Sequence, residues 1–176
     1  MSSTDTKTAS EHILYFAYGS NMSVRRLRAR VPSAQLVCNA ALRGHQLCFH
    51  KRSHVDGSAK CDACVTGDPA DTVQGVVFRF KQAEKPLLDQ LEGLGKGYEV
   101  KPVQLLNRNG QTVCAYTYIA TDIDATLKPF DWYKIHVLTG ARENTLPADY
   151  IDRIAAVEAW IDADNERCRR ELSIYL

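Results

Sequence analysis

The sequence predicts an α+β fold, a small mixed and largely antiparallel barrel-like sheet with flanking helices. Strand-like runs dominate the middle of the chain, helical patterns dominate its end, and hairpin connections replace the regular strand–helix alternation of a parallel sheet. A chain of 176 residues is long enough to bury one full hydrophobic core. We therefore expect a single domain over residues 12–176, preceded by a disordered tail over residues 1–11.

The first unit predicted is a strand, a tight polar loop and a short helix. Residues 13–18 (ILYFAY) are apolar, β-branched or aromatic and end at Gly19, which is typical of a buried strand. Ser23 can cap a helix whose apolar residues recur at helical spacing over residues 24–31, until Pro32 ends it.

Strands are predicted for most of the middle of the chain. Residues 35–49 alternate loosely between apolar and polar side chains and predict one or two strands. Residues 50–72 are rich in Gly, Ser, Asp and Lys and predict a long loop, a kind of segment that often carries function. A strand over residues 73–80 follows, and then a helix with Pro86 in its first turn and Gly93 as its stop.

The last third begins with a hairpin and ends in helices. Residues 98–106 and 111–120 predict two strands flanking Asn109–Gly110, a dipeptide that suits a two-residue hairpin turn. Asp131 can cap a helix that runs to Gly140. A further helix is predicted from Pro147, with core-facing residues Tyr150, Ile151, Ile154, Val157, Ile161 and Cys168.

The charge composition of the chain argues against some classes of binding partner. The chain has 22 Lys and Arg against 21 Asp and Glu, so its formal net charge of +1 argues against nucleic acid or a membrane surface as a partner. Residues 1–10 have the pattern of neither a secretory signal nor a transit peptide, and no apolar run approaches the roughly 18 residues that span a bilayer. We expect a cytoplasmic protein with free thiols, and a homodimer is left open.

Four segments, in this order along the chain, resemble motifs of the γ-glutamylcyclotransferase family: YFAYGSNM at residues 15–22, LDQLEG at 88–93, KGYEV at 96–100 and WYKIHVLTGARENTLP at 132–147. A YGSN tetrapeptide alone would be weak evidence for this family, whereas four matches in the same order are strong evidence for the resemblance. The resemblance implies a γ-glutamylcyclotransferase-like barrel with a cavity for a small γ-glutamyl substrate at one end. It also implies a reaction that needs no metal or cofactor.

The resemblance implies that Glu92 is the catalytic acid/base. The residues that it implies for substrate binding are Tyr15, Tyr18, Gly19, Ser20, Asn21, Tyr98 and Tyr133. Cyclisation requires the α-amine to lose a proton before it attacks the γ-carbonyl, and the leaving amine must gain one, which a single carboxylate can manage. We expect Glu92 to lie between helix-end carbonyls and apolar side chains; without the resemblance, a solvated glutamate at a helix end is the alternative.

The loop over residues 19–21 joins a strand to a helix start. Backbone N–H groups are left without partners at such a start and suit an α-carboxylate. An ordinary turn is the alternative on the residues alone. Tyr98 and Tyr133 could each bind substrate through the hydroxyl or be a core ring whose hydroxyl is satisfied elsewhere.

Residues 50–66 are where the chain departs from the family pattern, in the stretch DGSAKCDAC, and this affects the expected choice of substrate. His50, His54, Cys61 and Cys64 are candidate zinc ligands, but a single C-x-x-C in a loop lacks the second knuckle of a structural zinc site. We expect no metal there. A redox role for the C-x-x-C is disfavoured because no helix begins at its first cysteine.

Two other functions remain open. Ser20 could be a hydrolase nucleophile, but it lacks a G-x-S-x-G elbow and an identifiable histidine partner. A non-catalytic module that senses a small γ-glutamyl or acidic metabolite could keep the same cavity. A carboxylate at position 92 argues against such a module, because it would repel an anionic ligand.

Overall fold

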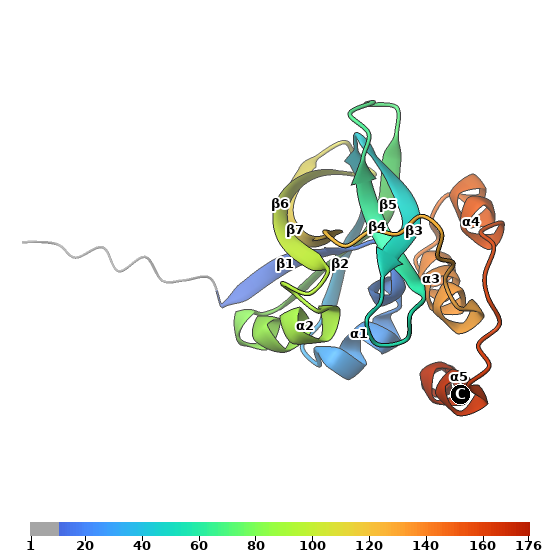
Figure 1. Cartoon of the computed structure of the whole chain (residues 1–176). Coiled ribbons are helices and arrows are strands. Elements are labelled where there is room, and N and C mark those ends of the chain that lie inside the picture. The colour runs from blue at the N-terminus through green and yellow to red at the C-terminus, as the bar shows by residue number, and fades with distance from the viewer. Residues whose placement is uncertain (1–10) are drawn as a thin grey trace, which may run out of the picture.

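A closed five-stranded barrel forms the centre of the computed structural model, which describes residues 11–176 (Figure 1). The strands in spatial order are β1 (His12–Ala17), β5 (Thr72–Lys81), β2 (Gln35–Arg43), β6 (Tyr98–Asn107) and β7 (Thr112–Ala120). Neighbours pair antiparallel, except that β1 and β7 run parallel where the barrel closes. The predicted α+β class and mixed, largely antiparallel barrel are confirmed. The tail predicted over residues 1–11 lies, apart from residue 11, outside the described residues.

A separate hairpin stands beside the barrel (Figure 1) and contradicts part of the predicted long loop. It consists of β3 (His45–Arg52) and β4 (Ala59–Val65), paired antiparallel. The small and polar residues of β4 resemble a loop by composition, yet Ala59 and Ala63 are completely buried. Pairing with the preceding strand β3 decides that this segment is a strand, and the composition of the segment alone does not report such pairing.

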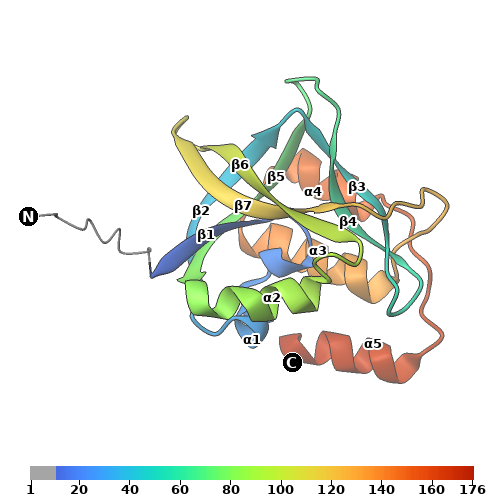
Figure 2. The ribbon, with the colours of Figure 1, turned by 60° about the vertical axis from the view of Figure 1, so that its left-hand side comes forward.

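Helices cover the barrel's lower end and one side in Figure 2. They are η1 (Ser20–Met22), α1 (Val24–Arg30), η2 (Gln82–Glu84), α2 (Lys85–Glu92), α3 (Asp131–Glu143), α4 (Ala148–Ala155), α5 (Asn165–Leu172) and η3 (Ser173–Tyr175). The predicted ends of α2 are confirmed: Pro86 lies in its first turn, and Gly93 caps it in the left-handed conformation. None of the helices within residues 11–176 is long and apolar enough to cross a membrane.

The predicted bounds of α3 are wrong at both ends. Phe130 is the N-cap and Asp131 is already the first helical residue. At the other end the helix continues three residues past Gly140, to Glu143. A Cβ on Gly140 would lie 2.5 Å from the backbone nitrogen of Ser23, so this glycine permits close packing of α3 on η1 instead of ending the helix.

The single helix predicted from Pro147 to Cys168 is two helices. The first, α4, ends at Ala155, and α5 begins at Asn165 behind Asp164, whose carboxylate accepts a hydrogen bond from the backbone of Arg167. Ile161 lies in the connection and is 86% exposed, although helical periodicity placed it toward the core. The side-chain cap at Asp164 favours a new helix start at this point.

The β6–β7 hairpin is confirmed, but its turn differs from the two-residue turn expected. Gly110 N donates to Asn107 O, and Asn107 N donates to Gln111 O, so three residues form the loop. Within residues 107–111 only Gly110 has a positive φ, of 73°. A type I turn followed by a left-handed glycine needs one positive φ instead of two.

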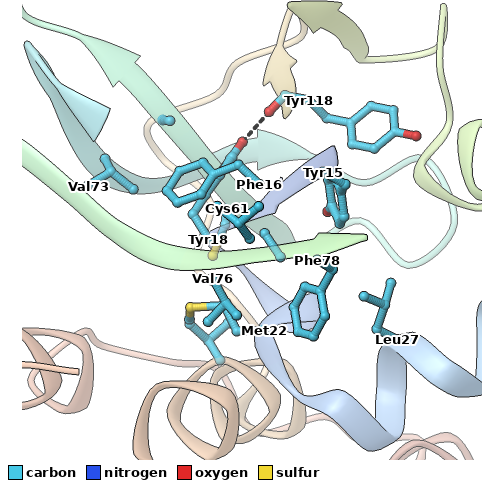
Figure 3. Close-up of a cluster of buried hydrophobic side chains, with 14 of the residues drawn as sticks. Tyr15, Phe16, Tyr18, Met22, Leu27, Cys61, Val73, Val76, Phe78 and Tyr118 are labelled. Carbon is cyan, nitrogen blue, oxygen red and sulfur yellow. Dashed lines mark hydrogen bonds between the residues drawn. The ribbon is translucent and has the colours of Figure 1, made fainter. Parts of the chain in front are cut away.

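Apolar side chains from β1 and β5 fill the core on both faces of the sheet (Figure 3). Phe16 is completely buried on one face, and Val76 and Phe78 are completely buried on the other, on the side of Met22 from η1 and Leu27 from α1. The β1 strand thus holds the start of η1 against the core, which positions the residues described next.

Candidate active site

The structure brings all of the sequence-predicted site residues to one small pocket. Its lining consists of Tyr15, Tyr18, Gly19, Ser20, Asn21, Cys61, Glu92, Tyr98, Tyr118 and Tyr133. These residues come from β1, η1, β4, α2, β6, β7 and α3, so the pocket forms only in the folded chain. Sequence reasoning missed Cys61 as a lining residue, and it missed Tyr118.

Glu92 is held by one of its two carboxylate oxygens. Oε1 accepts a hydrogen bond of 2.6 Å from Arg30 Nη1 and one of 2.9 Å from Asn21 Nδ2. Oε2 makes no hydrogen bond to any residue in the described part of the chain. The Glu92 side chain is only 17% exposed, so the two hydrogen bonds at Oε1 also fix the position of Oε2.

Arg30 is a functional neighbour that the sequence did not reveal. It is the last residue of α1 and also donates to Asn21 Oδ1 at 3.2 Å, so it contacts both Glu92 and Asn21. The surroundings expected for Glu92 were helix-end carbonyls and apolar side chains, and this cation corrects that expectation. The helix holds several other arginines, and nothing local marks Arg30 among them.

The pocket tyrosines differ in what their hydroxyl groups do. Tyr18 donates to the backbone oxygen of Tyr118 (Figure 3), and Tyr98 donates to the backbone oxygen of Cys61. By contrast, the Tyr133 hydroxyl accepts from Cys61 N at 3.1 Å, and the Tyr15 hydroxyl accepts from Asn21 Nδ2 at 3.2 Å. Neither Tyr15 nor Tyr133 donates to a backbone carbonyl, although the Tyr133 hydroxyl also interacts with the Cys61 thiol.

Burial keeps these two hydroxyl groups protonated. It raises the pKa of Tyr15 well above its usual value, and the nearby Glu92 carboxylate raises it further. Burial likewise raises the pKa of Tyr133, with Cys61 adding to the effect. Both side chains are consequently hydrogen-bond donors at neutral pH.

The loop before α1 forms the floor of the pocket as a short 3₁₀ turn. Its first hydrogen bond runs from Met22 N to Gly19 O, at 3.1 Å, so the N–H groups of Ser20 and Asn21 precede it and have no acceptor among the described residues. A Cβ on Gly19 would lie 3.1 Å from Cys61 Cβ and 3.4 Å from the Tyr133 hydroxyl. Glycine at this position keeps the pocket open.

The rival chemistries find little support at this pocket. Burial raises the pKa of Cys61 to about 12, so its thiol stays neutral and is a poor nucleophile. Cys61 and Cys64 belong to a strand, where residues three apart point to opposite faces. Ser20 has no histidine beside it among the residues that line the pocket.

Comparisons with known proteins agree on one family. A match to the AIG2-like family covers residues 72–154. The γ-glutamylcyclotransferase of Mus musculus is 34% identical over 84% of this chain and 80% of its own length, and that of Homo sapiens is 32% identical with the same coverage. A solved γ-glutamyl cyclotransferase superimposes with a TM-score of 0.78 and 28% identity, over 91% of this chain and 99% of its own.

The sequence relatives span most of both chains, and the solved structure shares the barrel and its surrounding helices. The match to the AIG2-like family includes Glu92, Tyr98, Tyr118 and Tyr133 of the pocket. The chain therefore belongs to the γ-glutamylcyclotransferase family.

Proposed function

We propose that this chain is a γ-glutamylcyclotransferase that converts a γ-glutamyl amide to 5-oxoproline and releases the amine, with Glu92 as its general acid and base. The observation that carries the proposal is the Glu92 carboxylate, anchored at Oε1 by Arg30 and Asn21 and unbonded at Oε2 within the described chain. An anchored carboxylate with one available oxygen suits proton transfer to and from a bound substrate.

Proton transfer proceeds in two steps. Glu92 removes a proton from the substrate's α-ammonium group, and the resulting amine attacks the γ-carbonyl carbon. In the second step Glu92 passes that proton to the nitrogen of the scissile amide and the carbon–nitrogen bond breaks. The extra proton left on the ring nitrogen by the attack passes to the departing amine, which leaves as an ammonium ion. The attack is intramolecular, so the main task of the protein is to hold the glutamyl chain in a folded pose, and the chemistry requires only proton transfer.

The pocket offers separate donors for the charged parts of the substrate. The backbone N–H groups of Ser20 and Asn21 suit the α-carboxylate. Tyr15 and Tyr133, whose hydroxyl groups donate to no backbone carbonyl, suit the carbonyl oxygen on which negative charge develops. Tyr18 and Tyr98 are committed to backbone carbonyls, so in this proposal they shape the pocket and contact the substrate through their rings.

The test is product analysis with a panel of γ-glutamyl compounds that differ in their amine: amino acids, larger peptides and simple amines. The expected result is 5-oxoproline and free amine in equal amounts from at least one compound. Hydrolysis to glutamate would contradict the proposed mechanism. Binding without turnover across the whole panel would overturn the enzymatic function and favour the sensing module.

A further inference from the structure

A second cluster of reactive side chains lies on the β3–β4 hairpin, on the face of β4 opposite the pocket. The thiol sulfurs of Cys48 and Cys64 and a ring nitrogen of His50 all lie within 4.8 Å of one another. All three side chains are half-buried. We call this group the Cys48–His50–Cys64 cluster.

Strand register builds the cluster. Cys48 pairs with Asp62 and Gln46 pairs with Cys64, so Cys48 and Cys64 are diagonal neighbours on one face of the hairpin. His50 is the extra residue at a register shift between Phe49 and Lys51, and its ring reaches Asp62 on that face. Cys61 lies on the other face, against Tyr133, which removes it from any site with Cys64.

Asp62 orients the histidine. Its Oδ2 lies 2.9 Å from His50 Nε2, while Oδ1 accepts a hydrogen bond from Ala120 N at 2.8 Å. The carboxylate is 2% exposed and thus fixed by the fold. Engagement of Nε2 leaves Nδ1 as the ring nitrogen available to an ion. Histidines that bind metals commonly have their other nitrogen held by a carboxylate in this way.

We propose that the Cys48–His50–Cys64 cluster binds one Zn²⁺ ion. Zinc prefers thiolate and imidazole ligands, at about 2.3 Å and about 2.0–2.1 Å, and ligands at these distances lie closer together than the 4.8 Å limit met here. Small side-chain movements would therefore close the site. Binding displaces the two thiol protons to solvent, involves no oxidation, and leaves the fourth tetrahedral position for water.

This proposal revises the expectation that no metal binds. That expectation rested on Cys61 and Cys64 as a lone C-x-x-C in a loop. In the folded chain Cys48 replaces Cys61, and the ligands belong to two paired strands. Burial, together with the neighbouring Cys64, raises the pKa of Cys48 to about 11, so the ion must compete with a proton and should bind more weakly as the pH falls.

The direct experiment uses the full chain, reduced, treated with chelator and dialysed, with Zn²⁺ as the probe. Elemental analysis after a second dialysis should find one zinc per chain. Replacement by Co²⁺ should give the absorption bands of a thiolate–cobalt complex. Retention of no zinc would overturn the proposal, and so would a Cys48–Cys64 disulfide that forms in preference to zinc binding.

Variants identify the ligands. Cys48→Ser and Cys64→Ser should each abolish stoichiometric retention, whereas Cys114→Ser, which changes an exposed cysteine on β7, should retain one zinc. Asp62→Asn should weaken binding roughly 10- to 100-fold. Binding that survives both ligand variants would place the ion elsewhere and overturn the proposal.

A measurement on the unmodified chain covers the case in which a variant fails to fold. Zinc should protect Cys48 and Cys64 from alkylation, as read by peptide mass, while Cys114 continues to react at its metal-free rate. Equal alkylation of Cys48 and Cys64 with and without zinc would overturn the proposal.

Discussion

Helix α1 contributes to two partly buried Arg–Glu pairs with different surroundings. Arg30 contacts Glu92 at 2.6 Å beside the pocket, and Arg26, one turn earlier, contacts Glu171 at 3.0 Å near the end of the chain. The chemical groups and the exposure of the pairs are similar. Their surroundings differ: Glu92 borders the pocket tyrosines, whereas Glu171 also approaches His136 on α3.

This contrast shows that an Arg–Glu pair by itself indicates no function. The pair at Glu171 joins the C-terminal helix to α1 and α3, which is a structural task. The pair at Glu92 orients a carboxylate in the lining of the pocket. Substitutions at the two sites test this distinction: a change at Glu92 should lower activity, and a change at Glu171 should lower stability.

The largest effect is expected at Glu92. Glu92→Gln keeps the size of the side chain but cannot carry a proton, so kcat should fall roughly 100-fold or more, with KM and Tm little changed. Steady-state release of 5-oxoproline and thermal unfolding measure this. Glu84→Gln, which precedes α2 and bonds Ser33 outside the pocket, is the matched control and should keep its activity. Near-normal turnover in Glu92→Gln would mean that another base acts.

The opposite pattern is expected at Glu171. Glu171→Gln weakens the contact with buried Arg26 and should cost about 1–3 kcal/mol of unfolding free energy, which corresponds to roughly 3–8 °C in Tm. Activity should change by less than about twofold. Glu166→Gln, an exposed change on the same helix, should leave Tm unchanged. A large loss of kcat in Glu171→Gln without destabilisation would abolish the distinction between the two pairs.

A smaller effect, on KM, is expected when the space beside Gly19 in the pocket is filled. Gly19→Ala places a methyl group against Cys61 and the Tyr133 hydroxyl, so KM should rise roughly tenfold, or about 1.4 kcal/mol, while Tm stays close to that of the parent chain. Initial-rate kinetics over a range of substrate concentrations give the value. An unchanged KM would mean that the glutamyl group binds away from Gly19.

The smallest effect is the pH dependence of the structural pair. Hydrogen bonds from His136, together with Arg26, lower the pKa of Glu171 to about 2, from an ordinary value of 4.5. A lowered pKa stabilises the fold above the ordinary value, and this contribution is lost as the pH falls toward 2. The stability difference between the parent chain and Glu171→Gln should therefore shrink from pH 5 toward pH 2. Urea unfolding at several pH values measures it, and a constant difference would contradict the assignment.

Sequence patterns predicted most elements because those elements depend on local features. The apolar run of β1, the Pro86 start of α2 and the Gly93 stop act within a few residues of themselves, and each is found as expected. Two of the errors occur where contacts with another element decide the outcome. Ala59–Val65 becomes a strand through pairing with β3, and Gly140 serves close packing on η1.

For the site, the sequence by itself determined which residues carry the family motifs, and the site residues that these motifs imply all line one pocket. It could not identify Arg30 as the partner of Glu92, because 62 residues separate the two along the chain. Nor could the sequence show that Cys48, and not Cys61, lies beside Cys64, since strand register determines which side chains share a face. Helical periodicity and capping depend on neighbouring residues in the sequence. The contacts between Arg30 and Glu92 and between Cys48 and Cys64 form only when the barrel closes and the hairpin folds beside it.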